Sequence, residues 1–232
     1  MKNTEQYNLL ANLFRYPMAE YKSHVNECND YVQTHFPEAS KEMETFTSFV
    51  NGKTAFEIEE VFGQTFHIQA ICFLDLGYVL FGEDYKRGDF LVQMKNEQAK
   101  ANNDCGSELA DNLPNVLSLI PLLKDEEFRT ELGARIIIPA IEKMIGEFDS
   151  ARMELKTKVR KKKEKVILLE NLEGGNIYQH AIKALLAVLK EDFKGTEYQD
   201  PTIIPGLRGD VLSCGSSCST PEEADMKTAV TK

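Results

Sequence analysis

Apolar residues recur every three or four positions along most of the chain up to residue 190, which is the period of amphipathic helices. A first short helix should end near Arg15, because Tyr16 precedes Pro17 and is disfavoured in the helical region. Residues 21–50 predict one or two helices with a break at Phe36-Pro37, and Asn51-Gly52 follows as a stop signal. The N-terminal part of the chain is therefore expected to be helical throughout.

The same periodicity continues after this point. Thr54 is a plausible N-cap, and the pattern from Ile71 through Leu74 to Phe81 predicts a helix that runs to Gly82. Asp89 should help to begin the next helix, and residues 102–106 form a turn cluster.

Three further apolar stripes follow, over 113–123, 128–148 and 178–189. Pro139 should kink or divide the second of them, because proline lacks a backbone donor and clashes with the preceding turn. Only Val166 to Leu169 resembles a strand, and it is too short to decide. The prediction is an all-α, single-domain helical bundle.

Composition supports one helical domain over residues 1–195 and a flexible tail over 196–232, where Pro and Gly are followed by a Cys/Ser-rich, polar end. No apolar run of eighteen or more residues and no secretory signal is present, so a cytoplasmic location is expected. Five scattered cysteines fit a reducing compartment. Cys214 and Cys218 supply only half of a tetrahedral metal site, and a disordered pair without a cofactor is preferred to metal or redox use.

The net charge of -10 hides an asymmetry. Residues 152–165 hold eight Lys/Arg and two acids, which leaves 19 basic and 35 acidic residues elsewhere. Such a field repels nucleic acid and attracts a cationic partner. The Lys-rich segment 156–165 leaves an alternative open: a pterin-nucleotide carrier or another nucleotide-binding protein that uses these lysines. A solvated helix face explains the run equally well.

No pattern for catalysis is present. The four histidines lack the i, i+3 or i+4 partners that bring two ligands to one helical face. The Gly174-Gly175 pair lacks the strand and lysine of a phosphate loop, and no serine or cysteine lies in a nucleophile motif. We therefore expect a binding protein that holds no metal or cofactor and is not an enzyme.

Two neighbouring segments, 78–94 and 108–120, each combine an apolar helical face with acidic residues. A groove between helices with acidic edges would accept a basic, partly apolar peptide. Arg87 is expected to pair internally with one of the acids. The predicted peptide-binding residues are Tyr78, Phe81, Glu83, Asp84, Asp89, Glu108, Asp111, Leu113 and Leu117.

Both segments resemble a known family. Residues 82–88, GEDYKRG, resemble the G-E-x-x-x-R-G signature of NarJ-type nitrate reductase assembly chaperones, the delta-subunit branch of the TorD/DmsD superfamily. Residues 108–114, ELADNLP, resemble that family's E-L-P-D-H-L-P segment, with Ala110 and Asn112 as departures, and the stretch from Leu9 to Pro17 matches as well. The resemblance covers roughly residues 5–190 and leaves the tail outside.

This resemblance implies a TorD/NarJ-like helical bundle that acts as a cytoplasmic, non-catalytic chaperone. Its partner would be the N-terminal or twin-arginine-like region of the catalytic (alpha) subunit of a nitrate reductase-like molybdoenzyme. The chaperone would hold the apo-subunit open while the molybdenum cofactor is inserted, before membrane attachment or export. It would work as a monomer or weak dimer, without nucleic acid and without inserting into the membrane itself.

Overall fold

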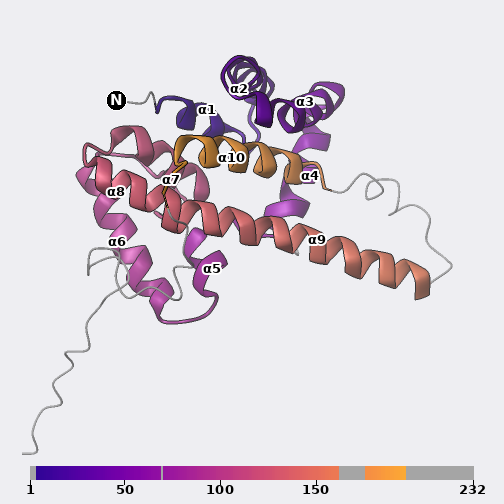
Figure 1. Ribbon diagram of the computed structural model, residues 1–232. Coiled ribbons are helices and arrows are strands. Elements are labelled where there is room, and N and C mark those ends of the chain that lie inside the picture. The colour runs from indigo at the N-terminus through magenta and orange to yellow at the C-terminus, as the bar shows by residue number, and fades with distance from the viewer. Residues whose placement is uncertain (1–3, 69, 162–175, 197–232) are drawn as a thin grey trace, which may run out of the picture.

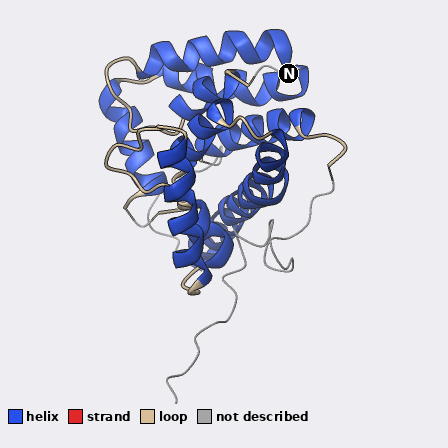
Figure 2. Ribbon diagram, turned by 90° about the vertical axis from the view of Figure 1, so that its left-hand side faces the viewer, coloured by secondary structure: helices blue, strands red, loops and turns tan. Residues whose placement is uncertain are grey.

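The computed structural model describes residues 4–68, 70–161 and 176–196. Within these ranges the chain is helical and contains no β-strand, and an isolated antiparallel bridge joins Asp75 to Asn112. The prediction of an all-α, single-domain fold is confirmed (Figures 1 and 2). The helices are α1 (Gln6–Asn12), α2 (Tyr21–His35), α3 (Pro37–Gly52), α4 (Ala55–Phe66), α5 (Leu76–Phe81), α6 (Lys86–Lys100), α7 (Leu113–Leu119), α8 (Glu126–Glu131), α9 (Ile138–Lys161) and α10 (Tyr178–Asp192).

The last described helix returns to the N-terminal part of the molecule. α10 packs against both α3 and α9, while α1 packs against α2 and α7 (Figure 1). The predicted break between two helices over 21–50 is confirmed, because Phe36 leaves the helical region directly before Pro37. Helices from both ends of the described chain therefore share one core.

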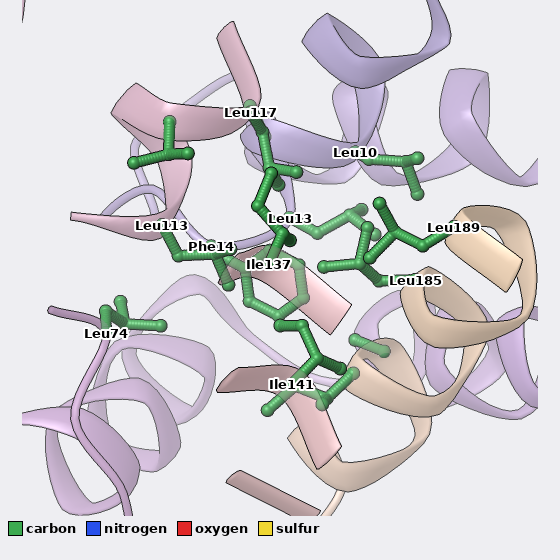
Figure 3. Packing of buried hydrophobic residues seen from close by; sticks show 14 of the residues in the cluster. Leu10, Leu13, Phe14, Leu74, Leu113, Leu117, Ile137, Ile141, Leu185 and Leu189 are labelled. Carbon is green, nitrogen blue, oxygen red and sulfur yellow. The ribbon is translucent and has the colours of Figure 1, made fainter. Parts of the chain in front are cut away.

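One continuous apolar cluster fills that core. It contains Leu10 of α1, Leu117 of α7, Ile141 of α9 and Leu185 of α10, and all four side chains are at most 1% exposed. Figure 3 shows these residues converging from helices that are far apart in the sequence. Such burial of apolar area is the main stabilising term of a domain of this size.

Two predicted helix starts have different outcomes. Thr54 caps α4 as predicted, and it forms a reciprocal capping box with Glu57. The helix predicted from Ile71 is wrong at its start, because α5 begins only at Leu76. Asp75, directly before α5, is extended and bridges Asn112, so a tertiary contact here overrides the local helical pattern. Gly82, with φ of 61°, ends α5 in the left-handed region, as the predicted stop requires.

The predicted interruption near Pro139 is also confirmed. A π-helical turn, η2 (Leu132–Ile137), joins α8 to α9 immediately before Pro139. In a regular α-helix the amide of residue 139 would donate to the carbonyl of Arg135, and proline has no such amide. The wider turn absorbs this loss, which is a common origin of π-bulges within helices. A short 3-10 turn, η1 (Ile120–Leu122), follows α7.

Several predictions fall on residues outside the described ranges. These are the tail with Cys214 and Cys218, the strand-like residues 166–169 and the Gly174-Gly175 break. The backbone of α9 is described to Lys161, so the first part of the Lys-rich segment 156–165 is helical. In the described part of the chain, none of the helices combines the length and apolarity that crossing a bilayer demands.

Candidate functional site

The residues just before the first of the two segments singled out in the sequence are joined to the second segment. The bridge between Asp75 and Asn112 joins the residues before α5 to those before α7. The amide of Leu76 donates to the carbonyl of Asp111 (3.0 Å), and the amide of Leu113 donates to the carbonyl of Leu74 (2.8 Å). The structure therefore fixes the starts of α5 and α7 against each other.

A groove of about 600 Å³ lies beside this junction. It is bounded by the residues that follow α1, the second half of α4 and the two joined segments. Its lining residues are Phe14, Arg15, Tyr16, Phe62, Phe66, His67, Phe73, Leu74, Asp75, Ser107, Glu108, Asn112, Pro114 and Asn115. Aromatic side chains from three separate parts of the chain thus face one concave surface.

The aromatic wall is held in place by contacts within the groove and beside it. Tyr16 packs edge-on against Phe62 at a centroid distance of 5.7 Å, and its hydroxyl donates to Glu59 Oε2 (3.1 Å). Phe73 packs edge-on against Tyr78 at 4.5 Å. Tyr16 and Phe73 nevertheless remain 52% and 40% exposed, so they present fixed apolar surface to solvent.

Charges of both signs line the groove, and its arginine already has a hydrogen-bond partner. Arg15 donates from Nη2 to Ser118 Oγ (3.0 Å). Asp75 accepts from the side-chain amide of Asn112 (3.1 Å) through one oxygen, and Glu108 is exposed on the opposite segment. A cationic side chain placed between the two acids would gain charge-assisted hydrogen bonds. The groove thus combines aromatic surface with acidic groups.

The predicted site residues are spread over several places. Glu108 lines the groove, and half-buried Tyr78 supports its aromatic wall through Phe73. Glu83 and Asp84 are exposed on the turn between α5 and α6, where Asp84 accepts from the amide of Lys86 (2.9 Å).

Two others lie against or on α6: Phe81 ends α5 and Asp89 belongs to the first turn of α6. Phe81 packs against Phe90, with ring centroids 5.7 Å apart. Asp89 lines a second cavity, of about 800 Å³, between α6 and residues 122–128. That cavity and the groove share no lining residue, so the predicted acids do not form one continuous edge.

Three predicted contacts need correction. Leu113, Leu117 and Asp111 are fully buried, so a peptide on the surface of this structure does not touch them. The leucines belong to the core because α7 packs against α1. Asp111 Oδ2 accepts from the amide of Gly77 (3.0 Å), while its buried Oδ1 has no hydrogen-bond partner. Burial raises the pKa of this carboxyl.

Arg87 also differs from expectation. Among the described residues no ion pair joins it to a carboxylate. Its guanidinium carbon instead lies 5.0 Å from the ring centroid of Tyr78, a cation–π contact.

Sequence reasoning missed the aromatic residues of the groove and Asp75. Phe73 carried a usable signal, because it stands outside the helical stripe through Ile71, Leu74 and Tyr78. An apolar residue that no periodic pattern absorbs is a candidate for surface contact.

Comparison with known proteins adds no relative: no protein-family model matches the chain, and no curated protein matches it. Within the described residues, no group of three or more His, Cys, Asp or Glu is arranged to hold a metal ion. The groove beside the junction, with its exposed aromatic and acidic residues, is the candidate site.

Proposed function

We propose that this protein is an assembly chaperone that binds the N-terminal region of a nitrate reductase-like molybdoenzyme catalytic subunit. The observation that carries the proposal is the groove, in which exposed aromatic residues lie beside Asp75 and Glu108. The resemblance of residues 82–88 and 108–114 to NarJ-type chaperones supports the same partner. In this proposal the chaperone acts in the cytoplasm, makes or breaks no bond, and assists cofactor insertion before membrane attachment or export.

The chemistry of the groove suits a basic peptide with apolar residues. Arginine or lysine side chains would pair with the two carboxylates, and the apolar residues would cover Tyr16 and Phe73. Peptides that lie in grooves of helical proteins commonly combine such apolar anchors with flanking charges. The acidic balance of the whole chain, -10, would also speed the encounter with a cationic segment.

The test is calorimetric titration with a peptide that spans the first few dozen residues of a candidate catalytic subunit. The double variant Asp75→Asn, Glu108→Gln removes both groove carboxylates but keeps the oxygen that accepts from Asn112. It should weaken binding about ten-fold, as expected for two partly exposed ion pairs, and should reduce the salt dependence of affinity.

The double variant Glu83→Gln, Asp84→Asn is the matched control, because it removes two acids on the turn after α5 and leaves the groove intact. It should change affinity less than the groove variant does. Equal affinity for wild type and the groove variant would refute the groove assignment, and absence of any complex with authentic peptides would refute the chaperone proposal.

A further inference from the structure

The ring face of Tyr78 is occupied by a cation of the same chain. The guanidinium carbon of Arg87 lies 5.0 Å from the ring centroid, and both side chains are half-buried. Two exposed acids, Glu83 and Asp84, lie on the turn that leads to Arg87, yet within the described ranges neither forms an ion pair with it. The arginine is therefore placed on an aromatic ring although carboxylates are close along the chain.

This ring is directly connected to the groove. Tyr78 packs edge-on against Phe73, with centroids 4.5 Å apart and planes at 64°. Phe73 lines the groove and is 40% exposed. A peptide that covers Phe73 would consequently lie one ring away from the cation on Tyr78.

A buried carboxylate lies near the base of the Arg87 side chain. A Cβ atom added to Gly77 would be 2.7 Å from Asp111 Oδ2 and 3.5 Å from Arg87 Cγ, so both side chains approach the same backbone position. Asp111 Oδ1 is buried and has no hydrogen-bond partner. A guanidinium that leaves Tyr78 therefore has an unused acceptor close to its own stem, which lowers the cost of its displacement.

We propose that the face of Tyr78 is a guanidinium-binding subsite that Arg87 fills in the free protein and that an arginine of the bound peptide takes over. This inference rests on the proposed function and extends it to selectivity. An arginine side chain stacks on an aromatic ring through its planar guanidinium, whereas lysine offers a compact, strongly hydrated charge. The subsite should thus favour arginine-bearing peptides, and Arg87 acts as an internal competitor.

The first measurement compares peptide affinities of wild type and Arg87→Gln. Removal of the competitor should tighten binding of an arginine-bearing peptide about 2- to 30-fold, the range that a cation–π contact corresponds to. A peptide with lysine at every arginine position should gain less. Tyr78→Leu combined with Arg87→Gln is the control and should abolish the gain. If Arg87→Gln is too unstable to measure, Arg87→Lys replaces it. The affinity of Arg87→Lys for the arginine-bearing peptide should lie between that of wild type and that expected for Arg87→Gln.

A second measurement does not need the partner peptide. N-acetyl-arginine amide is titrated into protein that carries isotope-labelled tyrosine, and the Tyr78 ring resonances are followed by NMR. N-acetyl-citrulline amide is the uncharged control. The arginine probe should shift Tyr78 at lower concentration in Arg87→Gln than in wild type. Equal shifts from both probes, or no shift in Arg87→Gln, would overturn the subsite.

The two measurements separate the proposals. A peptide that binds wild type and Arg87→Gln equally well overturns the subsite and leaves the chaperone function standing. If the arginine probe binds at Tyr78 but no authentic peptide binds the protein, the subsite stands and the chaperone function is refuted.

Discussion

Gly77 lies where Asp111, Phe90 and Arg87 converge, at the start of α5. A Cβ atom at this position would lie 2.7 Å from Asp111 Oδ2 and 3.0 Å from the ring of Phe90. Both neighbours are fully buried, so neither moves without disturbing the core. The absence of a side chain is what allows the amide of Gly77 to reach the carboxylate of Asp111.

Gly77→Ala should therefore destabilise the protein by about 1–3 kcal/mol, the usual cost of overpacking. Gly63→Ala is the matched control, because nothing lies within 4 Å of its added Cβ in α4, and it should stabilise by up to about 1 kcal/mol. Urea unfolding followed by circular dichroism measures both changes. An unchanged Gly77→Ala protein would show that the segment carrying Asp111 is free to shift.

Asp111 gives the molecule a specific dependence on pH. Its pKa is raised by burial and further by the charge of Asp75, while the hydrogen bond from Gly77 and the charge of Arg87 act in the opposite direction. For a carboxyl with a raised folded-state pKa, the stabilising contribution is complete below the unfolded pKa. It is lost as pH rises through the folded pKa, because the folded state must then hold a buried charge.

Asp111→Asn has no carboxyl to ionise, so it does not lose stability in this way as the pH rises. The unfolding free energy of Asp111→Asn relative to wild type should therefore be larger at pH 7 than at pH 4. Urea unfolding at both pH values checks the sign, and the comparison cancels groups that titrate alike in the two proteins. A relative stability that is independent of pH would contradict the described burial of the carboxylate.

The start of α4 is a local device that stabilises a whole helix. The amide of Glu57 donates to Thr54 Oγ1 (3.3 Å), and the amide of Thr54 donates to Glu57 Oε2 (2.9 Å). The backbone hydrogen bond from Thr54, with help from Lys53, lowers the pKa of Glu57 to about 2. The contribution of this carboxylate is thus present at neutral pH and is lost as pH falls towards that value.

Thr54→Ala should cost about 1 kcal/mol of stability, as N-cap replacements do, and should raise the pKa of Glu57 in an NMR titration. Thr45→Ala, at an exposed position inside α3 where the hydroxyl donates only to the carbonyl of Lys41, should leave stability almost unchanged. Equal effects of the two substitutions would mean that the capping box contributes nothing.

The contrast between α4 and α5 shows which helix boundaries a sequence can predict. The cap of α4 is formed by two residues three positions apart, so the local sequence predicts it. The start of α5 depends on hydrogen bonds from Leu76 and Gly77 to Asp111, 34 or more positions away. No local pattern contains that partner, and for this reason the stripe from Ile71 predicts a helix start that is too early.

Sequence alone also cannot tell which apolar helix face lines the candidate site and which is buried in the core. The acidic, apolar character of the two segments is visible in the sequence, but the residues joined to the second segment, 74–77, lie just before the first. An apolar stripe has the same spacing whether it lines a groove or fills a core, so Leu113 and Leu117 could not be placed in advance. Only the packing of α7 against α1 decides that they are inside.

The described part of the molecule depends on contacts between α10 and helices from the first part of the chain. α10 packs against α3 and α9, and the hydroxyl of Tyr178 at its start lies 3.0 Å from that of Tyr21 in α2. The same cluster includes residues of α1 and α7, which position the groove. A single cluster of this kind predicts that distant helices lose their structure together.

Leu185→Ala in α10 and Leu10→Ala in α1 test this cooperativity, since both side chains are buried in the shared cluster. Each should cost about 2–5 kcal/mol and lower one common unfolding transition. Val92→Ala, at a position 60% exposed on α6, is the control and should change stability by less than about 0.5 kcal/mol. The chain has no tryptophan, so circular dichroism and tyrosine fluorescence are the two probes. Because the helices around the groove all contribute side chains to that cluster, the two probes should report the same transition in both variants. Separate transitions for α1 and α10 would contradict the single core.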